Sequence, residues 1–599
     1  MRAANAHAPS MLKSPLSRAL PLIPLLAAAL GAQTAPRPAT ADEALAFDVG
    51  EAVVQELVLP DALSGPLTVE LFVDGAQRTL FVAPYSLRAD GFQVLVQRAD
   101  GSIERVEPAP VATVRGFLVG EPESYFAGSL TNGSLQGVLR THTGASLHGL
   151  QPLSLVDASA PASLHLLHDS ADALPSPYHC GTADVIGGRP TSGGTGAAAE
   201  GGPSSKWIEI AADADVEFYN KNGSSVSQTQ NDVENVINGV DSIYNSDFNI
   251  RYLIGTILVR TSEPDPYTTS QAGPMLDQFH LEWALHQTAI KRDVAHLFTG
   301  KNIAGSTIGI ANLNGICSLG AGYGVSQSKF SGSMTARVAL TAHELGHNWG
   351  ANHCNGTSQC KIMCSGLGGC SGGLTSFGPS ASAEIEAKLA LITCATGPPP
   401  TSAPTLTTVT PDTFPAFAPG LIELSGTSLE WVEQLTIGSA ALTAPAGFTP
   451  IDDGTIFVSG LKTAPGLGAQ SIVATNSIGT SNPASIAFTE TFPPALINSV
   501  FALTDNDYLW KIGGEANDLW FLAVSVGDDT TVPLFGFNLL LNSQLVGAGT
   551  LDAVGVAQKT FFLPPSAAGL SFFSQAATVD GDTGQFRGAS AVKASAVLI

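Results

Sequence analysis

Residues 343–353 have the clearest chemical potential of any stretch in the sequence, and they read His-Glu-Leu-Gly-His-Asn-Trp-Gly-Ala-Asn-His. On a helix, His343 and His347 lie one turn apart on the same face. That separation suits two nitrogen–metal bonds of ~2.0–2.1 Å to a single zinc ion. Gly350 can adopt a left-handed conformation at little steric cost, which would end the helix and turn the chain back. His353 is then placed to supply a third nitrogen.

Three protein ligands leave one coordination position open, which is typical of a catalytic zinc site rather than a structural one. Glu344 lies about 100° around the helix from His343, outside the ligand pair but within reach of a water in that position. We expect Glu344 to take the proton of the attacking water and to pass it to the leaving amine. The alternative is a set of ordinary histidines in a helix and turn, but five such fixed residues coincide by chance with a probability on the order of 10⁻⁵.

The stretch HELGHNWGANH resembles the zinc motif of the metzincin peptidases, and Lys361-Ile-Met-Cys364 resembles their Met-turn. The resemblance implies one catalytic zinc ion and places Met363 as an apolar floor beneath it. Without the resemblance, a methionine between cysteines would be read as ordinary core. Within the metzincins, the chain is most similar to the reprolysin group (adamalysins and ADAM-type peptidases) through residues 211–220, 236–245, 309–317 and 377–382.

Two positions depart from the reprolysin pattern. Cys354 follows the third histidine where the group usually has Asp, and the Met-turn comes early, among closely spaced cysteines. These departures concern the local disulfide pattern and the shape of the primed-side pocket, and they leave the metal ligands intact. Membership of another metzincin group is the alternative, and it would not change the chemistry.

The elements that must position these residues alternate between helices and strands. Apolar spacing predicts helices over 226–248 and 333–347, with strands near 207–212, 250–259 and 307–311. This alternation indicates an α/β domain over residues 206–396, with the mixed twisted sheet and helices that the metzincin resemblance implies.

The strand near 307–311 has a further expected role. The resemblance implies that Gly309, Ile310 and Ala311 form the sheet edge along which an extended substrate peptide aligns through main-chain hydrogen bonds. An ordinary internal strand is the alternative interpretation.

Seven cysteines are unevenly placed, and six of them follow residue 316: Cys317, Cys354, Cys360, Cys364, Cys370 and Cys394. Six clustered cysteines in an exported chain predict three disulfides, for which the sequence leaves 15 pairings open. The resemblance implies that Cys317 pairs with Cys394, and the other four pairings stay open.

Cys180 stands alone, upstream of the predicted catalytic domain. A thiolate is a good fourth ligand for zinc, and Cys180-Gly181 near the end of a leader resembles the cysteine switch of latent metzincins. We therefore expect Cys180 to occupy the open coordination position in the latent form only. An intermolecular disulfide or an inert buried thiol are the alternatives.

The upstream part of the chain divides into three expected segments. Residues 1–35 have a positively charged flank, a short apolar run and small residues after it, which is typical of a secretory signal. Residues 36–185 show alternating strands and turn pairs, as in a β-rich propeptide that carries the cysteine switch. Residues 186–205 have almost no large side chains and are expected to be a flexible linker, in which cleavage would release the propeptide.

Downstream, residues 397–404 are a proline-rich linker. Residues 405–491 resemble an IPT/TIG β-sandwich, and residues 495–599 are expected to form another β-rich domain. These units could hold a surface or matrix ligand or serve as spacers, and fold likeness does not decide between the two.

Charge and composition exclude several functions. The chain has 27 lysines and arginines against 51 aspartates and glutamates, a net charge of −24. This balance argues against nucleic acid as a partner, and no stretch is long and apolar enough for a membrane anchor. The sequence therefore predicts a secreted, extracellular zinc endopeptidase that is made as a latent zymogen and acts on protein or peptide substrates. The alternative is a secreted adhesion protein whose metzincin domain is inactive. No residue pattern indicates calcium as a second cofactor.

Overall fold

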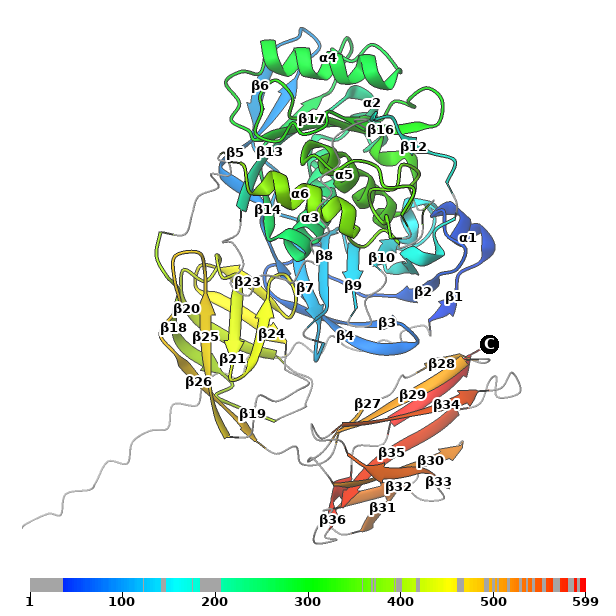
Figure 1. Ribbon diagram of the computed structural model, residues 1–599. Coiled ribbons are helices and arrows are strands. Elements are labelled where there is room, and N and C mark those ends of the chain that lie inside the picture. Colours follow the sequence, from blue (N-terminus) through cyan, green and yellow to red (C-terminus); the bar gives the residue numbers. More distant parts are fainter. Residues whose placement is uncertain are drawn as a thin grey trace, which may run out of the picture. The chain divides into compact units, whose positions relative to one another are not determined.

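The computed structural model describes most of the chain after residue 35 (Figure 1). The described residues are 36–183, 206–392, 394 and 401–598, except for gaps at 122, 142–146, 175, 358, 368–369, 371–372, 416–420, 460–467, 490–494, 498–500, 504–505, 514–517, 527–530, 535–536, 541–543, 552–555, 564–570, 580–585 and 590–592. The predicted signal (1–35) and linker (186–205) lie outside the described residues, as do residues 397–400 of the proline-rich linker. No helix in the described ranges has the length and apolar character needed to cross a membrane.

We call residues 36–183 the N-terminal region. Most of it forms an antiparallel nine-stranded sheet, in the order β1 (Arg37–Pro38), β2 (Val53–Glu56), β11 (Leu164–Asp169), β10 (Leu147–Pro152), β9 (Ser134–Arg140), β8 (Tyr125–Thr131), β7 (Thr113–Leu118), β4 (Ala76–Pro84) and β3 (Leu67–Val73). One short helix, α1 (Ala41–Ala46), begins with a capping box between Thr40 and Glu43. The alternation of strands and turn pairs in the sequence is thus realised as hairpins.

We call residues 206–394 the central region. Its strands belong to a mixed eight-stranded sheet, in the order β12 (His179–Cys180), β16 (Thr307–Ala311), β17 (Tyr323–Ser326), β15 (Val294–Phe298), β13 (Lys206–Ala214), β14 (Ile250–Arg260), β5 (Arg88–Gln97) and β6 (Ile103–Val106). Three of these strands, β12, β5 and β6, come from the N-terminal region. The predicted strands of the central region are confirmed, but nothing in the sequence indicated that strands from upstream would join them.

Two long helices lie between the two sheets, α3 (Val226–Phe248) and α5 (Met334–Asn348) (Figure 1). Both begin at a serine, because the hydroxyls of Ser225 and Ser333 accept backbone N–H groups of the first helical turn. α3 ends at Asn249, whose φ of 57° is left-handed. The remaining helices of the central region are α2 (Val216–Lys221), α4 (Ala272–Leu285) and α6 (Pro379–Leu389). The two helices predicted from apolar spacing are confirmed.

Residues 405–489 form two sheets that enclose one apolar core. The first contains β18 (Thr405–Thr410), β20 (Leu421–Thr427), β24 (Thr455–Ser459) and β23 (Phe448–Asp452); the second contains β19 (Thr413–Pro415), β26 (Ala484–Thr489), β25 (Gly468–Thr475), β21 (Gln434–Ile437) and β22 (Ala440–Thr443). This is a β-sandwich arrangement, and its assignment to the IPT/TIG type stays a prediction.

The last part of the chain is also built of strands. One sheet contains β27 (Ala495–Ile497), β29 (Asn506–Gly513) and β34 (Val556–Leu563). A second sheet contains β28 (Phe501–Leu503), β37 (Lys593–Leu598), β35 (Ser571–Val579), β30 (Leu519–Val526) and β33 (Gln544–Thr550), and β36 (Phe586–Ala589) pairs with β35. The strands β31 (Thr531–Leu534) and β32 (Phe537–Leu540) pair with each other as a two-stranded sheet. Trp510 and Trp520 are buried in its core.

Candidate metal centre

Helix α5 presents two of the predicted ligands, His343 and His347. All fifteen of its residues are buried, so the imidazoles project into the interior of the protein and not into bulk solvent. Their Nε2 atoms lie 3.1 Å apart. A spacing of four residues on a helix therefore brings both rings to one point, as expected from one turn of separation.

A tight turn after α5 brings the third histidine to the same point. Gly350 has a φ of 95°, a left-handed conformation that suits glycine, and its N–H donates to the His347 carbonyl. The chain reverses there, and His353 Nε2 comes to lie 3.2 Å from Nε2 of His343 and 3.2 Å from Nε2 of His347. The structure therefore places Gly350 and His353 where the sequence pattern required them.

Hydrogen bonds on the far side of two rings decide which nitrogen faces the centre. His343 Nδ1 lies 2.7 Å from the Ile362 carbonyl oxygen, and His347 Nδ1 lies 2.7 Å from the Ala351 carbonyl oxygen. A carbonyl only accepts, so each Nδ1 carries the proton and each Nε2 presents a lone pair. Burial lowers the pKa of His343 to about 3, with the neighbouring His353 as a further cause, which keeps the ring neutral.

This arrangement fits a zinc ion. Lone pairs that face one another across 3.1–3.2 Å repel unless a shared electrophile lies between them. Tetrahedral coordination with Zn–N bonds of ~2.0–2.1 Å separates the nitrogens by about 3.3 Å, close to the spacing found here. The backbone carbonyls that hold the Nδ1 protons are the outer partners that metal-binding histidines usually have.

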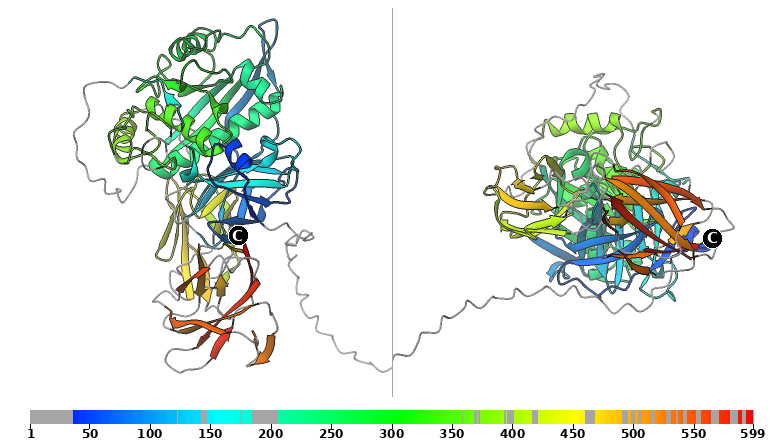
Figure 2. Two further views of the ribbon diagram at one scale, coloured as in Figure 1. Left: turned by 90° about the vertical axis from the view of Figure 1, so that its right-hand side faces the viewer. Right: turned by 90° about the horizontal axis from the view of Figure 1, so that it is seen from below.

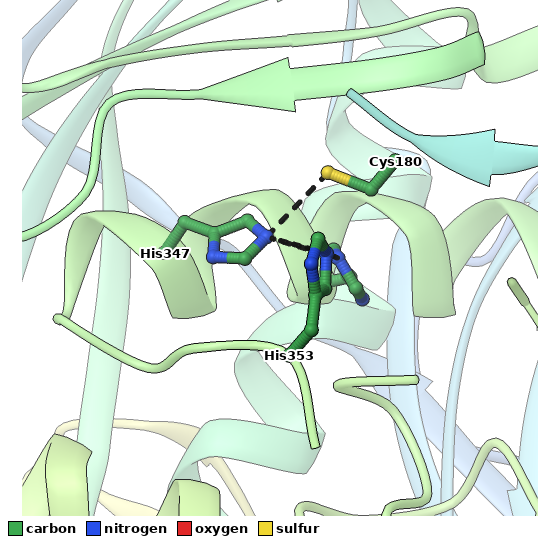
Figure 3. Close-up of side chains that lie close together, drawn as sticks. Cys180, His347 and His353 are labelled. Carbon is green, nitrogen blue, oxygen red and sulfur yellow. Dashed lines mark hydrogen bonds between the residues drawn. The ribbon is translucent and has the colours of Figure 1, made fainter. Parts of the chain in front are cut away.

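Cys180 lies on the open side of the three imidazoles (Figure 3). Its Sγ is 3.5 Å from His347 Nε2, and the four possible ligand atoms of Cys180, His343, His347 and His353 all lie within 4.8 Å of one another. Backbone hydrogen bonds hold the segment, since Cys180 N–H donates to the Ser365 carbonyl. Cys180 is buried and forms no disulfide. The structure thus places the lone cysteine beside the three imidazoles, and its role as a zinc ligand in the latent form stays a prediction.

Glu344 lies beside this cluster and not in it. Its Oε2 accepts a hydrogen bond from the Cys180 thiol at 3.4 Å. Its Oε1 is buried and has no hydrogen-bond partner among the residues that the structure describes. Burial raises the pKa of Glu344 well above its usual range. Oε2 is therefore the oxygen that faces the Cys180 sulfur, while Oε1 lies against Gly309.

Strand β16 borders the cluster, and the N-terminal region occupies its free edge. β12 runs parallel to β16, and Gly181 N–H donates to the Gly309 carbonyl. The Thr182 hydroxyl bonds both main-chain groups of Ala311, accepting from N–H at 2.9 Å and donating to C=O at 3.1 Å. Ile310 lies between them and pairs with β17. The predicted peptide-aligning edge is therefore covered by residues that come directly after Cys180.

Sequence reasoning did not foresee the part that Gly309 plays in the site. A Cβ at this position would come within 2.2 Å of Glu344 Oε1, so the absence of a side chain makes room for the carboxylate. Thr182 was also not singled out. Neither residue belongs to the histidine motif, and no local pattern in the sequence marks a contact between segments so far apart.

Met363 packs under the helix that bears the histidines. It is fully buried, and its sulfur lies so close to Gly346 that a Cβ there would come within 2.7 Å of it. Gly346 precedes His347, so Met363 packs against the ligand-bearing turn, and its role as an apolar floor beneath a zinc ion stays a prediction.

Disulfides surround this segment. The structure contains Cys317–Cys394, the pair implied by the resemblance, and it settles the four cysteines left open as Cys354–Cys360 and Cys364–Cys370. Each of the latter pairs spans only six residues. The two short loops stand on either side of Met363 in the chain.

Among the residues that the structure describes, one other group of possible ligands lies elsewhere in the central region. Carboxylate oxygens of Glu217, Glu263 and Asp265 lie within 4.8 Å of one another. Lys301 already forms an ion pair with Glu217. Of the three, Glu263 is exposed, Glu217 is half-buried and Asp265 is buried, and we assign no calcium to this acidic cluster.

Comparison with known proteins agrees with this geometry. Residues 204–380 match the family model described as metallo-peptidase family M12, of the reprolysin type. Over 174 residues, the chain is 30% identical to disintegrin and metalloproteinase domain-containing protein 19 of Mus musculus and of Homo sapiens. Over the same length it is 29% identical to disintegrin and metalloproteinase domain-containing protein 12 of Mus musculus. These alignments cover 28% of this chain and 17–18% of each relative, so the chain spans less than a fifth of the length of the relatives it matches. The central region is therefore a reprolysin-type metalloprotease domain of family M12.

Proposed function

We propose that this protein is a secreted zinc endopeptidase that is synthesised as a latent zymogen. The observation that carries the proposal is the convergence of three imidazole Nε2 atoms on one point, with Glu344 beside them and Cys180 over the open side. The signal-like composition of residues 1–35 supports secretion.

The residues divide the chemistry between them. His343, His347 and His353 would hold the zinc ion, which supplies Lewis-acid polarisation of a carbonyl group and of water. Glu344 is placed to orient the attacking water through Oε2, the oxygen that faces the Cys180 sulfur, to accept its proton, and to return that proton to the leaving amine. The main-chain groups of Gly309 and Ala311 would align an extended peptide once Gly181 and Thr182 have left them.

Latency follows from the position of Cys180. While its sulfur faces the three nitrogens, the place that water needs is filled, and residues 181–182 cover the edge of β16. Withdrawal of this short segment would open both the metal and the peptide-binding edge together. We call residues 177–183 the latch.

The test is chelator-sensitive hydrolysis of casein by the full-length protein after its linker has been cut. We expect the wild type to lose activity with a chelator and to regain it with zinc. Glu344→Ala should lower turnover about 10²- to 10⁴-fold while still binding one zinc ion per chain. Glu386→Ala, an exposed glutamate on α6, is the matched control and should keep wild-type activity.

The competing function is an adhesion protein whose metalloprotease-type domain is inactive. A cut protein that binds zinc stoichiometrically and hydrolyses neither casein nor a denatured protein would establish that alternative. The complete set of three histidines and Glu344 favours activity. A domain that has lost its activity no longer needs these side chains, so substitutions of the glutamate or of a metal ligand would be expected in it.

A further inference from the structure

We propose that the N-terminal region stays bound to the metalloprotease-type domain after the linker has been cut, as a permanent second subunit, and that only the latch leaves the metal centre. The retention rests on contacts between the two regions and holds whether or not the domain is an active peptidase. Its consequence for activation deepens the proposed function.

The first observation is a shared sheet. β5 of the N-terminal region pairs in parallel with β14 from Ile254 to Arg260, and β6 then pairs with β5 (Figure 2). Every residue of β14 is buried. Departure of β5 would leave the N–H and C=O groups on one edge of β14 without partners and expose its apolar side chains. The sheet of the domain is thus completed by the N-terminal region.

The second observation is a shared core. One continuous cluster of buried apolar side chains includes residues from both regions. The N-terminal region contributes Leu87, Phe92, Val94, Tyr125, Ala127, Val138 and Leu147. The same cluster contains residues of α3 such as Val236 and Val240. Separation would expose both halves of this core to water, which opposes dissociation in the way that it opposes unfolding.

The third observation is a set of buried ion pairs that cross the boundary. Arg115 donates to the Asp241 carboxylate at 2.6 Å, with the two side chains 6% and 0% exposed. Arg88 pairs with Glu234 at 2.9 Å, and Glu234 is 2% exposed. These charge-assisted hydrogen bonds join the two regions. Within the joined particle, replacement of one partner would leave the other as an uncompensated buried charge, which is strongly unfavourable and would favour separation.

Backbone groups of the N-terminal region are also bound by the domain. The Asn238 side-chain amide, on α3, donates to the carbonyls of Val114 and Gly128. In the other direction, the Gln151 side chain accepts the Met334 N–H and donates to the Gly332 carbonyl. Met334 is the first residue of α5, and its N–H has no acceptor within the helix. The N-terminal region therefore supplies the hydrogen-bond acceptor at the start of the helix that carries His343 and His347.

The latch is held mainly by hydrogen bonds along a short stretch of backbone. β12 comprises two residues; His179, Cys180, Gly181 and Thr182 form hydrogen bonds with the domain, and the Tyr178 ring packs edge-on against Phe330. No shared core side chain belongs to this segment. A cut after residue 183 frees the end of the latch, which can then peel from the metal while the remaining contacts stay in place.

The experiment uses the full-length protein with residues 191–197 replaced by the recognition sequence of a site-specific protease. After complete cutting, size-exclusion chromatography and native mass spectrometry should show both fragments in one particle, separable only in denaturant. That particle, without loss of the N-terminal fragment, should have the casein-hydrolysing activity. Elution of the N-terminal fragment apart from a folded central domain would overturn the proposal.

A variant pair tests the basis of the retention. Arg88→Ala removes one cross-boundary ion pair, while Arg98→Ala removes an exposed pair with Glu104 inside the N-terminal region. After cutting, dissociation on dilution should be at least ten-fold faster for Arg88→Ala than for Arg98→Ala. Equal dissociation of the two variants would contradict the role of the cross-boundary contacts. An inactive protein whose fragments still co-elute would count against the proposed function alone.

Discussion

The carboxylate of Glu344 lies directly against the α-carbon of Gly309. A Cβ on Gly309 would come within 2.2 Å of Glu344 Oε1, much closer than two such atoms can approach. A helix and a sheet edge that are separate in sequence therefore meet where a residue without a side chain is required. This contact places the proposed proton acceptor between the metal-binding nitrogens and the peptide-aligning strand.

Gly309→Ala is expected to impair catalysis without unfolding the protein. The methyl group would meet the far end of a flexible side chain, so Glu344 can move aside, but its carboxylate then leaves the position that proton transfer requires. We expect kcat to fall about 10²-fold, with zinc content unchanged. Gly273→Ala on α4 is the control, because nothing lies within 4 Å of a Cβ there. Wild-type turnover in Gly309→Ala would refute this account of the contact.

Cys180→Ser is expected to release latency. The hydroxyl is a poorer ligand for zinc than a thiolate, while the backbone hydrogen bonds of the latch are kept. The uncut variant should hydrolyse casein at least ten-fold faster than the uncut wild type, measured with the linker verified intact by mass. After cutting, the two proteins should have equal activity. An uncut variant as latent as the wild type would show that Cys180 is not what holds the site closed.

Gly350→Ala is expected to disturb the third ligand. The φ of 95° is strained for any residue with a side chain, at a cost of about 1–3 kcal/mol. The turn would relax by shifting His353, so we expect zinc affinity to fall by at least ten-fold in a competition titration with a chelator. Gly356→Ala, where a Cβ meets nothing within 4 Å, should bind zinc as tightly as the wild type. Unchanged zinc affinity in Gly350→Ala would contradict this prediction.

Acid is expected to destabilise the N-terminal region through two buried histidines. His165 Nε2 accepts a hydrogen bond from the Leu135 N–H, and its Nδ1 lies 2.9 Å from the Ser163 carbonyl oxygen. Both ring nitrogens therefore have hydrogen-bond partners that suit the neutral ring. Burial lowers the pKa of His165 and of His168 to about 4. In the unfolded chain their pKa is near ~6.5. Between these values the unfolded chain binds more protons, so stability is full above about pH 6.5 and falls as the pH drops toward 4.

The size of this effect can be measured. Each histidine should cost roughly 2 to 3 kcal/mol of unfolding free energy between pH 7 and pH 4.5. Urea denaturation at the two pH values, followed in the wild type and in the His165→Gln/His168→Gln double variant, gives the comparison. The double variant should show a markedly smaller loss. Identical pH dependence in both proteins would mean that other groups dominate.

Local features of the site could be predicted because they depend on residues close together in the chain. The separation of His343 and His347 by four residues, and the glycine before His353, imply one face and one turn. The positions of α3, α5, β13, β14 and β16 followed from apolar periodicity. The pairing of Cys354 with Cys360 did not follow from the sequence. Cys360 lies close in the chain to both Cys354 and Cys364, so sequence separation alone does not decide which of them is its partner.

The sequence by itself determined the chemistry: three imidazoles, a carboxylate, and a lone thiol upstream. Only the tertiary structure decided that the thiol faces the imidazoles, that Gly309 makes room for Glu344, and that β5 completes the domain's sheet beside β14. The physical reason is that helical and turn geometry depends on short-range spacing, which the sequence displays. Parallel strand pairing and contacts between distant segments depend on which apolar surfaces are buried together, and no local pattern records that.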